Sequence, residues 1–357
     1  MSLFRRILPL ITLFCAVSCM EYGPAQEETF ATDLSHRGLF IICEGNYMYG
    51  NASLSYYDPE TKEIQNEIFA RSNAFPIGDV AQSMTINNGL CWTVVNNSGV
   101  IFALDPVTFK EKRRITGFTS PRYIHFTGSG KAYVTQIWDP RIYIVDPDKC
   151  TVTGYIETGM DFETGSTEMM VEKDGYVYVN CWSYQNRILK IDTATDRIIN
   201  ELVVGIQPSA IIKDGYGKLW AITDGGYEGS PYGHERATLV KIDADNFVIE
   251  KTFTFDYGST PRGLTASGDG KTIYWINDGV YSMDAASETL PAEPIIEPLG
   301  TIFYALIVDP TNGDIYVSDA VDYTSNGVMR RYSAAGNLID TFRVGINPGN
   351  FCWREAQ

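Results

Sequence analysis

The sequence predicts an all-β protein, a seven-bladed β-propeller, and three observations support this prediction. A short β-rich phrase that ends in Asp or a turn returns seven times. Successive copies lie 41 to 51 residues apart, which is the spacing of propeller blades. The segments between the copies alternate apolar and polar residues with the period of two that β-strands have. The seven copies are residues 55–59, 101–106, 142–147, 188–192, 239–243, 280–284 and, in a degenerate form, 329–333.

Each repeat divides into four strands, and the fourth repeat shows the division best. We expect its strands at residues 166–171, 176–180, 187–191 and 197–203. Gly beside Asp or Asn marks the link between the first and second strands, because these residues favour tight turns. The turns recur at the same place in the repeat, so we expect them on one face of the disc.

The two ends of the propeller complement one another. The first repeat begins at its second strand, residues 39–43, whereas residues 345–353 resemble a first strand. We therefore expect the C-terminal strand to complete the first blade, which closes the ring and removes exposed sheet edges. The propeller domain then covers residues 38–357. This pairing would bring Cys352 near the strand of Cys43, so a disulfide between the two cysteines is one possibility.

Residues 1–18 have the features of a secretory signal peptide. Two arginines precede an apolar run, residues 7–17, that is too short to cross a bilayer as a stable helix. The run leads into a sequence that resembles a bacterial lipobox and ends at Cys19, so Cys19 is the predicted lipidation site. Residues 19–37 are then a lipidated Cys and a flexible tether, and the lipid alone would hold the protein on the membrane. Ordinary cleavage to a free secreted protein is the alternative.

The composition is that of a folded, acidic protein. The chain has 357 residues, of which 44% are hydrophobic and 13% aromatic, and its net charge is −16. Phosphate binding needs clustered Lys and Arg, so this charge argues against nucleic acid as a partner. Five cysteines follow Cys19 and none forms a CxxC pair, so we predict neither a disulfide framework nor a zinc site.

Closure of the ring places two sets of loops on one face, namely the loops between strands two and three and the loops between blades. The loops beyond strand two are rich in Tyr and Trp, and rigid aromatic side chains with amides suit a large, uncharged or zwitterionic ligand. Packing between blades and ordinary turn formation are the alternative explanation. An acid or amide ends strand two in every repeat: Glu44, Asn96, Gln136, Asn180, Asp224, Asn277 and Asp319.

The candidate ligand-binding residues come from these loops and strand ends, with two arginines that are able to meet a phosphate. The aromatic wall candidates are Tyr47, Tyr49, Trp138, Trp182, Tyr184, Tyr227, Tyr232 and Tyr323. The polar candidates are Asn96, Gln136, Asp139, Asn180, Gln185, Asn186 and Asp224, and the arginines are Arg122 and Arg262.

Catalytic motifs are scarce, and no catalytic residue is predicted. The chain has three histidines, and His125, which lies in an inner strand, is expected to be a core residue. No nucleophile elbow, HExxH or phosphate-binding loop is present in the sequence. No cofactor is required by any motif, although a ring of carboxylate and amide oxygens is able to bind Ca²⁺ or Mg²⁺. A metal-dependent propeller lactonase or lyase is therefore an alternative interpretation.

Four stretches of the chain resemble a known family. Residues 53–59, 117–126, 178–192 and 224–233 are similar to the YncE-like seven-bladed lipoproteins of Bacteroides-type bacteria, some of which are labelled surface-layer proteins. The similarity covers nearly all of residues 38–354. Within that group the chain most resembles the BtuG-type lipoproteins, which capture cobalamin at the cell surface.

The resemblance implies a lipid-anchored protein of the outer membrane, on the cell surface, that binds cobalamin or a related corrinoid. It also implies a partner, a TonB-dependent outer-membrane transporter that receives the ligand. Cobalamin is large and rimmed by amides, so a funnel of aromatic and amide side chains would satisfy its polar groups. A periplasmic location and a structural or interaction role in a surface layer stay open as alternatives.

Overall fold

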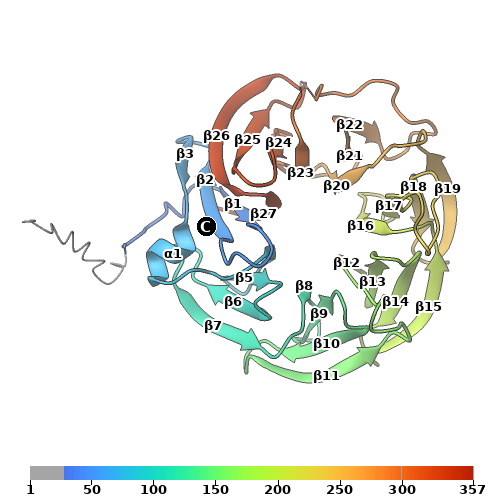
Figure 1. Ribbon diagram of the computed structural model, residues 1–357, viewed down its shortest axis with the longest axis horizontal. Helices are drawn as coiled ribbons and strands as arrows, with labels where there is room; N and C mark the ends of the chain where they lie inside the picture. The colour runs from blue at the N-terminus through green and yellow to red at the C-terminus, as the bar shows by residue number, and fades with distance from the viewer. Residues whose placement is uncertain (1–27, 299, 357) are drawn as a thin grey trace, which may run out of the picture.

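A computed structural model describes residues 28–298 and 300–356 as seven antiparallel sheets around a central axis (Figure 1). This confirms the predicted seven-bladed β-propeller. Six sheets have four strands and one has three. In each blade the first strand lies at the axis and the last strand lies at the rim (Figure 1).

The blades follow one another along the chain, and within each blade the strands succeed one another from the axis outward. Blade one has β27 (Pro348–Arg354), β1 (Gly38–Cys43), β2 (Ser53–Asp58) and β3 (Glu63–Gln65). Blade two has β4 (Ala81–Asn87), β5 (Leu90–Val95), β6 (Val100–Leu104) and β7 (Glu111–Thr116). Blade three has β8 (Pro121–Phe126), β9 (Ala132–Gln136), β10 (Arg141–Asp146) and β11 (Thr151–Glu157). Blade four has β12 (Met170–Lys173), β13 (Tyr176–Cys181), β14 (Arg187–Asp192) and β15 (Arg197–Val203).

The remaining three blades continue the same order. Blade five has β16 (Pro208–Lys213), β17 (Leu219–Thr223), β18 (Thr238–Asp243) and β19 (Val248–Thr254). Blade six has β20 (Arg262–Ala266), β21 (Thr272–Asn277) and β22 (Gly279–Asp284). Blade seven has β23 (Phe303–Val308), β24 (Ile315–Asp319), β25 (Asn326–Tyr332) and β26 (Leu338–Ile346).

The C-terminal strand β27 completes blade one, as predicted from the two ends of the chain. It pairs antiparallel with β1, and the register sets Cys352 opposite Phe40 and Cys43 opposite Pro348. The Cys43 side chain packs in the core between blades one and seven, whereas Cys352 packs against the core between blades one and two. The two thiols therefore lie on opposite sides of the sheet, and both are free.

The core is divided into seven apolar clusters, each of which lies between two neighbouring blades. Strand β1 shows why, because Leu39 and Ile41 face blade seven while Phe40 and Ile42 face blade two. A sheet that is buried on both faces needs apolar residues at every position, so this strand is a continuous apolar run. The same double burial holds the blades together around the ring.

Two departures from the repeat were not predicted. The outer strand β3 has only three residues and leads into the helix α1 (Ile68–Asn73), which lies beside blade two (Figure 1). Blade six has three strands among the described residues, and Val280 at its edge exchanges backbone hydrogen bonds with Ile295 and Ile296 instead. Within the described residues, no helix is long and apolar enough to cross a membrane.

Candidate functional site

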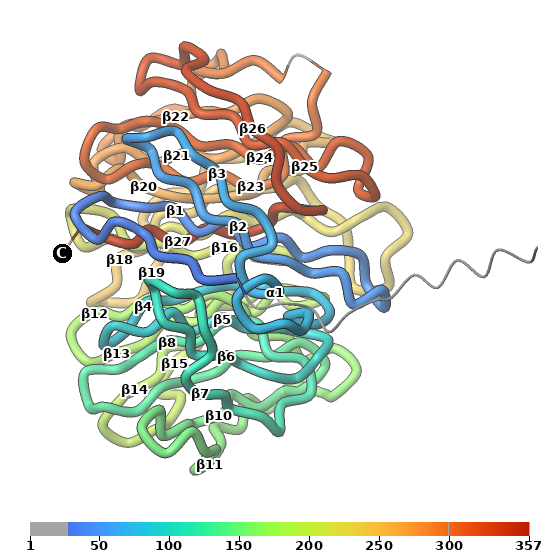
Figure 2. The backbone as a smooth tube through the Cα atoms, turned by 90° about the vertical axis from the view of Figure 1, so that its left-hand side faces the viewer, coloured from blue at the N-terminus to red at the C-terminus, as the bar shows by residue number. Residues whose placement is uncertain are grey.

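The two predicted sets of loops do share one face, which we call the loop face. Backbone hydrogen bonds join them, from Asn96 N to Val80 O at 2.7 Å and from Asp224 N to Gln207 O at 3.1 Å. Seen from the side, the long loops all extend in one direction, and short turns close the other end of the disc (Figure 2). We call that other end the turn face.

One position at or just before the start of the innermost strand brings a different residue toward the axis in each blade. We call this set the axial ring, and its members are Gln82, Arg122, Glu168, Ser209, Arg262, Tyr304 and Gly349. Six of the seven line one cavity of about 230 Å³, together with Glu44, Tyr123 and Trp182. We call this the floor cavity, because it lies at the centre of the loop face, between the inner ends of the blades.

Arg122 and Glu168 form the most buried ion pair of the floor cavity. Arg122 Nε donates to both Glu168 carboxylate oxygens, at 2.8 and 2.9 Å, and Nη1 of the same guanidinium donates to Gln82. The Glu168 side chain is 4% exposed. Burial raises the pKa of the Glu168 carboxyl, and the neighbouring Arg122 charge opposes that shift. The Arg122 guanidinium thus already forms hydrogen bonds with Glu168 and Gln82 of the protein itself.

Glu44 and Tyr304 form a second acidic pair on the opposite side of the same cavity. The Tyr304 hydroxyl donates to Glu44 Oε2 at 2.9 Å. Removal from solvent raises the pKa of the Glu44 carboxyl above its usual value, and burial followed by the Glu44 charge raises the pKa of Tyr304. Burial also raises the pKa of Tyr123, to about 12. A carboxyl group with a raised pKa in a cavity is a common feature of acid–base sites.

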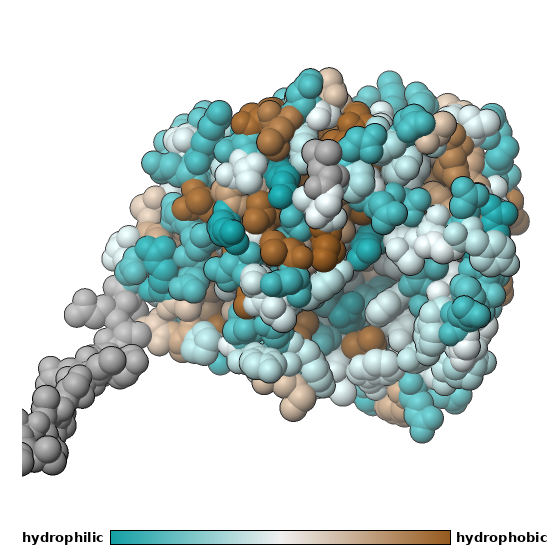
Figure 3. Space-filling model, turned by 45° about the horizontal axis from the view of Figure 1, so that its top comes forward, coloured by the Kyte–Doolittle hydropathy of each residue, from teal (hydrophilic) through white to brown (hydrophobic). Residues whose placement is uncertain are grey.

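The floor cavity continues both outward and along the axis. Outward, it shares Trp182, Ser209 and Arg262 with a cavity of about 440 Å³ that opens between blades four, five and six. Along the axis, it shares Tyr123, Ser209, Tyr304 and Gly349 with a channel of about 380 Å³ that is lined by polar and apolar groups. An oblique view shows the surface hollowed toward the centre of the disc (Figure 3). Together these spaces form a funnel of the size that ligand sites have.

Aromatic side chains also stand on the long loops of the loop face. Trp138, Tyr184, Tyr232 and Tyr323 line none of the cavities of the funnel. Trp138, Tyr184 and Tyr232 form a row, with ring centroids 6.4 Å apart for the first pair and 4.4 Å for the second. Trp138 is 45% exposed and Tyr232 46% exposed. On the opposite side, Tyr323 contacts Tyr304 with centroids 5.9 Å apart. Trp138, Tyr184 and Tyr323 have positive φ, which costs free energy in a bulky residue and fixes where its side chain stands.

The other aromatic candidates also lie on the loop face. Trp182 lines the floor cavity, and its indole N–H donates to Asp224 at 3.0 Å. Tyr227 is 52% exposed and lines the outward cavity. Tyr47 and Tyr49, at 66% and 78% exposed, extend from the loop after β1 and line none of the cavities of the funnel.

The amides that end strand two brace the connections between blades. Asn96 Nδ2 donates to Pro121 O at 3.0 Å, and Asn180 Nδ2 donates to Pro208 O at 2.6 Å. Gln136 Oε1 accepts from two backbone N–H groups of the loop that follows β7. All three side chains are buried, and Gln136 Nε2 and Asn180 Oδ1 have no hydrogen-bond partner among the described residues. Neither residue lines a cavity of the funnel, so these amides support the loop face rather than its cavities.

The remaining polar candidates are held by their own loops. Asp139 is 1% exposed and accepts from Arg141 and from the Tyr143 hydroxyl. Gln185 Nε2 donates to Thr164 O at 3.0 Å, and the backbone carbonyl of Asn186 accepts from Val204 N. These contacts position the loop that carries Trp182 and Tyr184.

Sequence reasoning missed five members of the axial ring, namely Gln82, Glu168, Ser209, Tyr304 and Gly349. Their strands carry no binding motif, and the side chains meet only because the ring closes. A signal was nevertheless present, because in four blades the axial residue directly follows a proline at the start of the inner strand. These pairs are Pro121-Arg122, Pro208-Ser209, Pro261-Arg262 and Pro348-Gly349.

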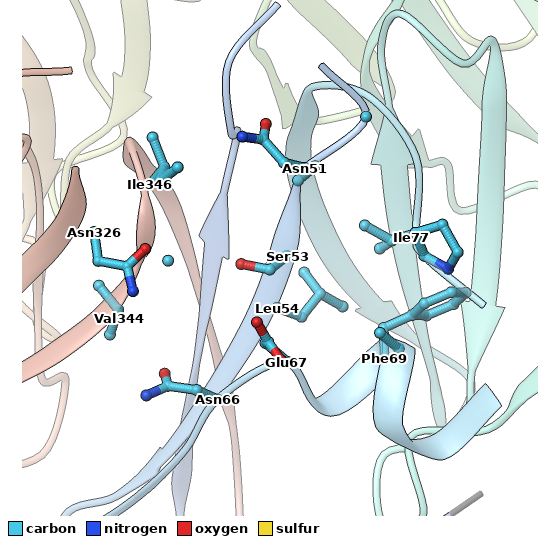
Figure 4. A pocket seen from close by; sticks show the side chains of 15 residues that line it. Asn51, Ser53, Leu54, Asn66, Glu67, Phe69, Ile77, Asn326, Val344 and Ile346 are labelled. Atoms are coloured by element: carbon cyan, nitrogen blue, oxygen red, sulfur yellow. The ribbon is translucent and has the colours of Figure 1, made fainter. Parts of the chain in front are cut away.

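A separate cavity of about 330 Å³, which we call the side groove, lies beside helix α1 between blades one and seven. Leu54, Phe69 and Val344 surround it, with Ser53 and Glu67 among its polar groups (Figure 4). The groove arises because β3 ends early and leaves part of β2 without an outer neighbour. It shares no lining residue with the cavities of the funnel.

The described part of the chain contains no group of three or more His, Cys, Asp or Glu side chains arranged to hold a metal ion. The histidine of the inner strand, His125, lies in β8, is partly buried, and has its Nε2 2.9 Å from a Glu172 oxygen. It lines none of the three cavities of the funnel.

Comparison with known proteins identifies a family and a fold. The sequence matches the family described as a domain of unknown function, DUF5074, over residues 37–347. Among curated proteins no relative matches the sequence. A quinonprotein alcohol dehydrogenase-like protein of Bacteroides thetaiotaomicron is 16% identical, with a TM-score of 0.65 over 90% of this chain and 78% of that chain.

Two further solved structures are enzymes with the same fold. The periplasmic gluconolactonase of Pseudomonas aeruginosa is 12% identical, with a TM-score of 0.63 over 89% of this chain and 100% of that chain. The virginiamycin B lyase of Staphylococcus aureus is 14% identical, with a TM-score of 0.59 over 76% of this chain and 88% of that chain. Likeness at this level of identity shows the fold alone.

Proposed function

The chain belongs to the DUF5074 family of seven-bladed propellers, and from that premise we propose that it captures a bulky small molecule in the funnel of its loop face. The proposed ligand class is corrinoid, with cobalamin as the reference compound. The protein would be anchored at the outer membrane by a lipid on Cys19 and would pass its ligand to a TonB-dependent transporter. Cys19 lies outside the described residues.

The observation that carries the proposal is the row of Trp138, Tyr184 and Tyr232, which lies on the same face as the funnel. The two outer rings of the row, Trp138 and Tyr232, are about half exposed, and positive φ at Trp138 and Tyr184 fixes where those side chains stand. Exposed, rigid aromatic side chains offer contact area at a low cost in side-chain entropy. A corrin ring with its peripheral amides needs such a surface next to hydrogen-bonding groups, because buried amides without partners are costly.

Titration of the purified chain with cyanocobalamin tests this proposal. Calorimetry should give saturable heat with one site, and the visible spectrum of the corrinoid should change at the same stoichiometry. The double variant Tyr184→Ala/Tyr232→Ala should bind more weakly while its melting temperature stays that of the wild type. Absence of heat and of any spectral change at micromolar concentrations would remove the corrinoid version of the proposal.

A second candidate function is acid–base chemistry on a lactone or a related substrate. It is favoured by the Glu44–Tyr304 pair, in which both groups have raised pKa values inside the floor cavity. A panel of sugar lactones, assayed with and without Ca²⁺ and Mg²⁺, tests it. Turnover that Glu44→Gln abolishes would support this function, because that change keeps the shape of the side chain. An inert wild-type protein across the panel would exclude it.

A further inference from the structure

The two arginines of the axial ring differ in what they contact. Arg122 is held by Glu168 and Gln82, as described above. Arg262, the equivalent residue of blade six, forms no hydrogen bond or ion pair with any residue that the structure describes. Its side chain is partly buried and lines both the floor cavity and the outward cavity. An unpaired guanidinium in a cavity keeps all five N–H donors available.

The carboxylate that lines the outward cavity, Asp224, already has hydrogen-bond donors on both oxygens. Asp224 Oδ1 accepts from Gln207 Nε2 at 2.9 Å and from Gly226 N at 2.8 Å, and Oδ2 accepts from the Trp182 indole at 3.0 Å. Of the acids that line the adjoining floor cavity, Glu168 pairs with Arg122, and Glu44 accepts from the Tyr304 hydroxyl. The Arg262 guanidinium is therefore the cation of this space that no described residue contacts through a hydrogen bond or an ion pair.

Two residues with hydroxyl groups line the same cavity as Arg262. Ser209 and Thr260 line the same outward cavity, and the Ser209 hydroxyl makes one long contact, 3.4 Å to Ile222 O. A guanidinium beside hydroxyl donors matches the fork geometry by which arginine holds phosphate or carboxylate. The overall charge of the chain is −16, so an anion would be attracted only by such a local arrangement.

We infer that the ligand carries an anionic oxygen group, a phosphate or a carboxylate, and that Arg262 binds this group in the outward cavity. The inference rests on the funnel as the ligand site that we propose above. Sequence reasoning treats the two arginines as equivalent ligand-binding residues. The inference separates them, because Arg122 holds Glu168 and Gln82 in the floor cavity whereas Arg262 binds the ligand.

The first experiment compares two corrinoids, one with an anionic oxygen group and one without. Cyanocobalamin contains a phosphodiester, whereas dicyanocobinamide lacks it together with the rest of the nucleotide loop. We expect Arg262→Gln to weaken binding of cyanocobalamin about tenfold or more and to leave dicyanocobinamide binding unchanged. Arg197→Gln is the matched control, because Arg197 is exposed on β15 at the rim of blade four and should change neither. Equal affinity of Arg262→Gln and wild type for cyanocobalamin, or equal weakening for both corrinoids, would overturn the inference.

A second experiment separates the inference from the corrinoid proposal. Inorganic phosphate and D-gluconate are titrated separately into wild-type protein and into Arg262→Gln, and ligand line broadening is followed by NMR. Broadening of either anion by the wild type but not by the variant supports the anion site, and the anion that responds tells phosphate from carboxylate. If neither responds and no corrinoid binds, the inference fails. If corrinoids bind equally to wild type and variant, only the anion site fails.

Arg262→Gln is a fair test because the side chain has no hydrogen bond or ion pair to lose among the described residues. Its melting temperature should equal that of the wild type. Arg262→Lys, which keeps the charge but not the planar fork, should retain part of the binding.

Discussion

The turn face and the loop face are built from the same seven sheets, but their polar side chains differ in whether they hydrogen-bond to the protein itself. On the turn face, the Asp of each repeated phrase accepts from the backbone N–H two residues later. The distances are 2.8 Å at Asp58, 3.0 Å at Asp105, 3.1 Å at Asp146, 2.8 Å at Asp192, 2.9 Å at Asp243 and 2.7 Å at Asp284. The polar groups of the repeat are thus used up in closing its turns.

The loop face has side chains that its own folding does not use. Arg262 has no partner among the described residues, and Tyr232 and Tyr227 are about half exposed. Positive φ occurs on both faces, and on the turn face it recurs at one turn position, as in Lys62, Phe109 and Phe247, whatever the residue is. On the loop face it also recurs at one position, directly before the inner strand, in Val80, Gln207 and Asn347. It falls on the aromatic residues Trp138, Tyr184 and Tyr323 as well, in loops of different lengths. We therefore expect the polar residues of the turn face to serve folding and the unpaired Arg262 guanidinium and exposed tyrosines of the loop face to be available to a ligand.

The largest effect on stability is expected beneath the loop face, where the funnel rests on the Arg122–Glu168 pair. Arg122→Leu would leave the Glu168 carboxyl buried without its partner, and breaking a buried pair in this way costs about 3–5 kcal/mol. Chemical denaturation of the variant beside wild type measures the loss. Arg262→Gln serves as the control, because the same ring position in blade six should tolerate the change. A loss below about 1 kcal/mol for Arg122→Leu would show that the two arginines are equivalent after all.

The repeat made the fold predictable, because the Asp phrase and the apolar strands are set by local turn chemistry and by burial on both faces of each sheet. Closure by residues 345–353 could also be predicted, because the first repeat has no first strand and residues 345–353 resemble a first strand with no other strands after it. Two features could not be predicted: β3 ends early, and blade six has no outer strand among the residues described. No local signal in the sequence says where other segments replace an outer strand.

The site was only partly predictable. The aromatic loops could be found, because long loops rich in Tyr and Trp are visible in the sequence. The strand-end amides Asn96, Gln136 and Asn180 were expected to face a ligand, yet most of their hydrogen-bonding atoms hold neighbouring backbone. Glu168 and Tyr304 were missed because their proximity to Arg122 and Glu44 exists only in the closed ring.

On the turn face, a single Asp should matter for stability and not for binding. Asp243 accepts from Asp245 N and Asn246 N, both at 2.9 Å, and pairs with Lys218 at 2.9 Å. Asp243→Ala should therefore cost about 1–2 kcal/mol of unfolding free energy. Ligand affinity measured on the same sample should stay at the wild-type value. A changed affinity would contradict the separation of the two faces.

The turn face should also contribute to how the protein responds to acid. Hydrogen bonding from Asn246 N, followed by the Lys218 side chain, lowers the pKa of Asp243 below its unfolded value of about 3.9. A lowered folded-state pKa contributes stability that is present above about pH 4 and is lost as the pH falls through the folded value. The melting temperature of the wild type should hence fall steeply below pH 4, and less steeply for Asp243→Ala. Parallel curves for the two proteins would refute this explanation.

The smallest effect on stability, and the sharpest test of the comparison, is expected at the tip of the loop face. Tyr232 is 46% exposed and its ring contacts Tyr184 at 4.4 Å between centroids. Tyr232→Ala should change the free energy of unfolding by no more than about 0.5 kcal/mol, as surface substitutions usually do. The same variant should bind the funnel ligand about tenfold more weakly, because a stacked aromatic contact is worth about 0.5–1.5 kcal/mol beyond its buried area. Tyr216→Ala is the matched control, since Tyr216 is 54% exposed on the turn face and should affect neither quantity. If Tyr232→Ala destabilised the protein but left binding intact, the aromatic row would be part of the scaffold, and the loop face would differ from the turn face only in the length of its loops.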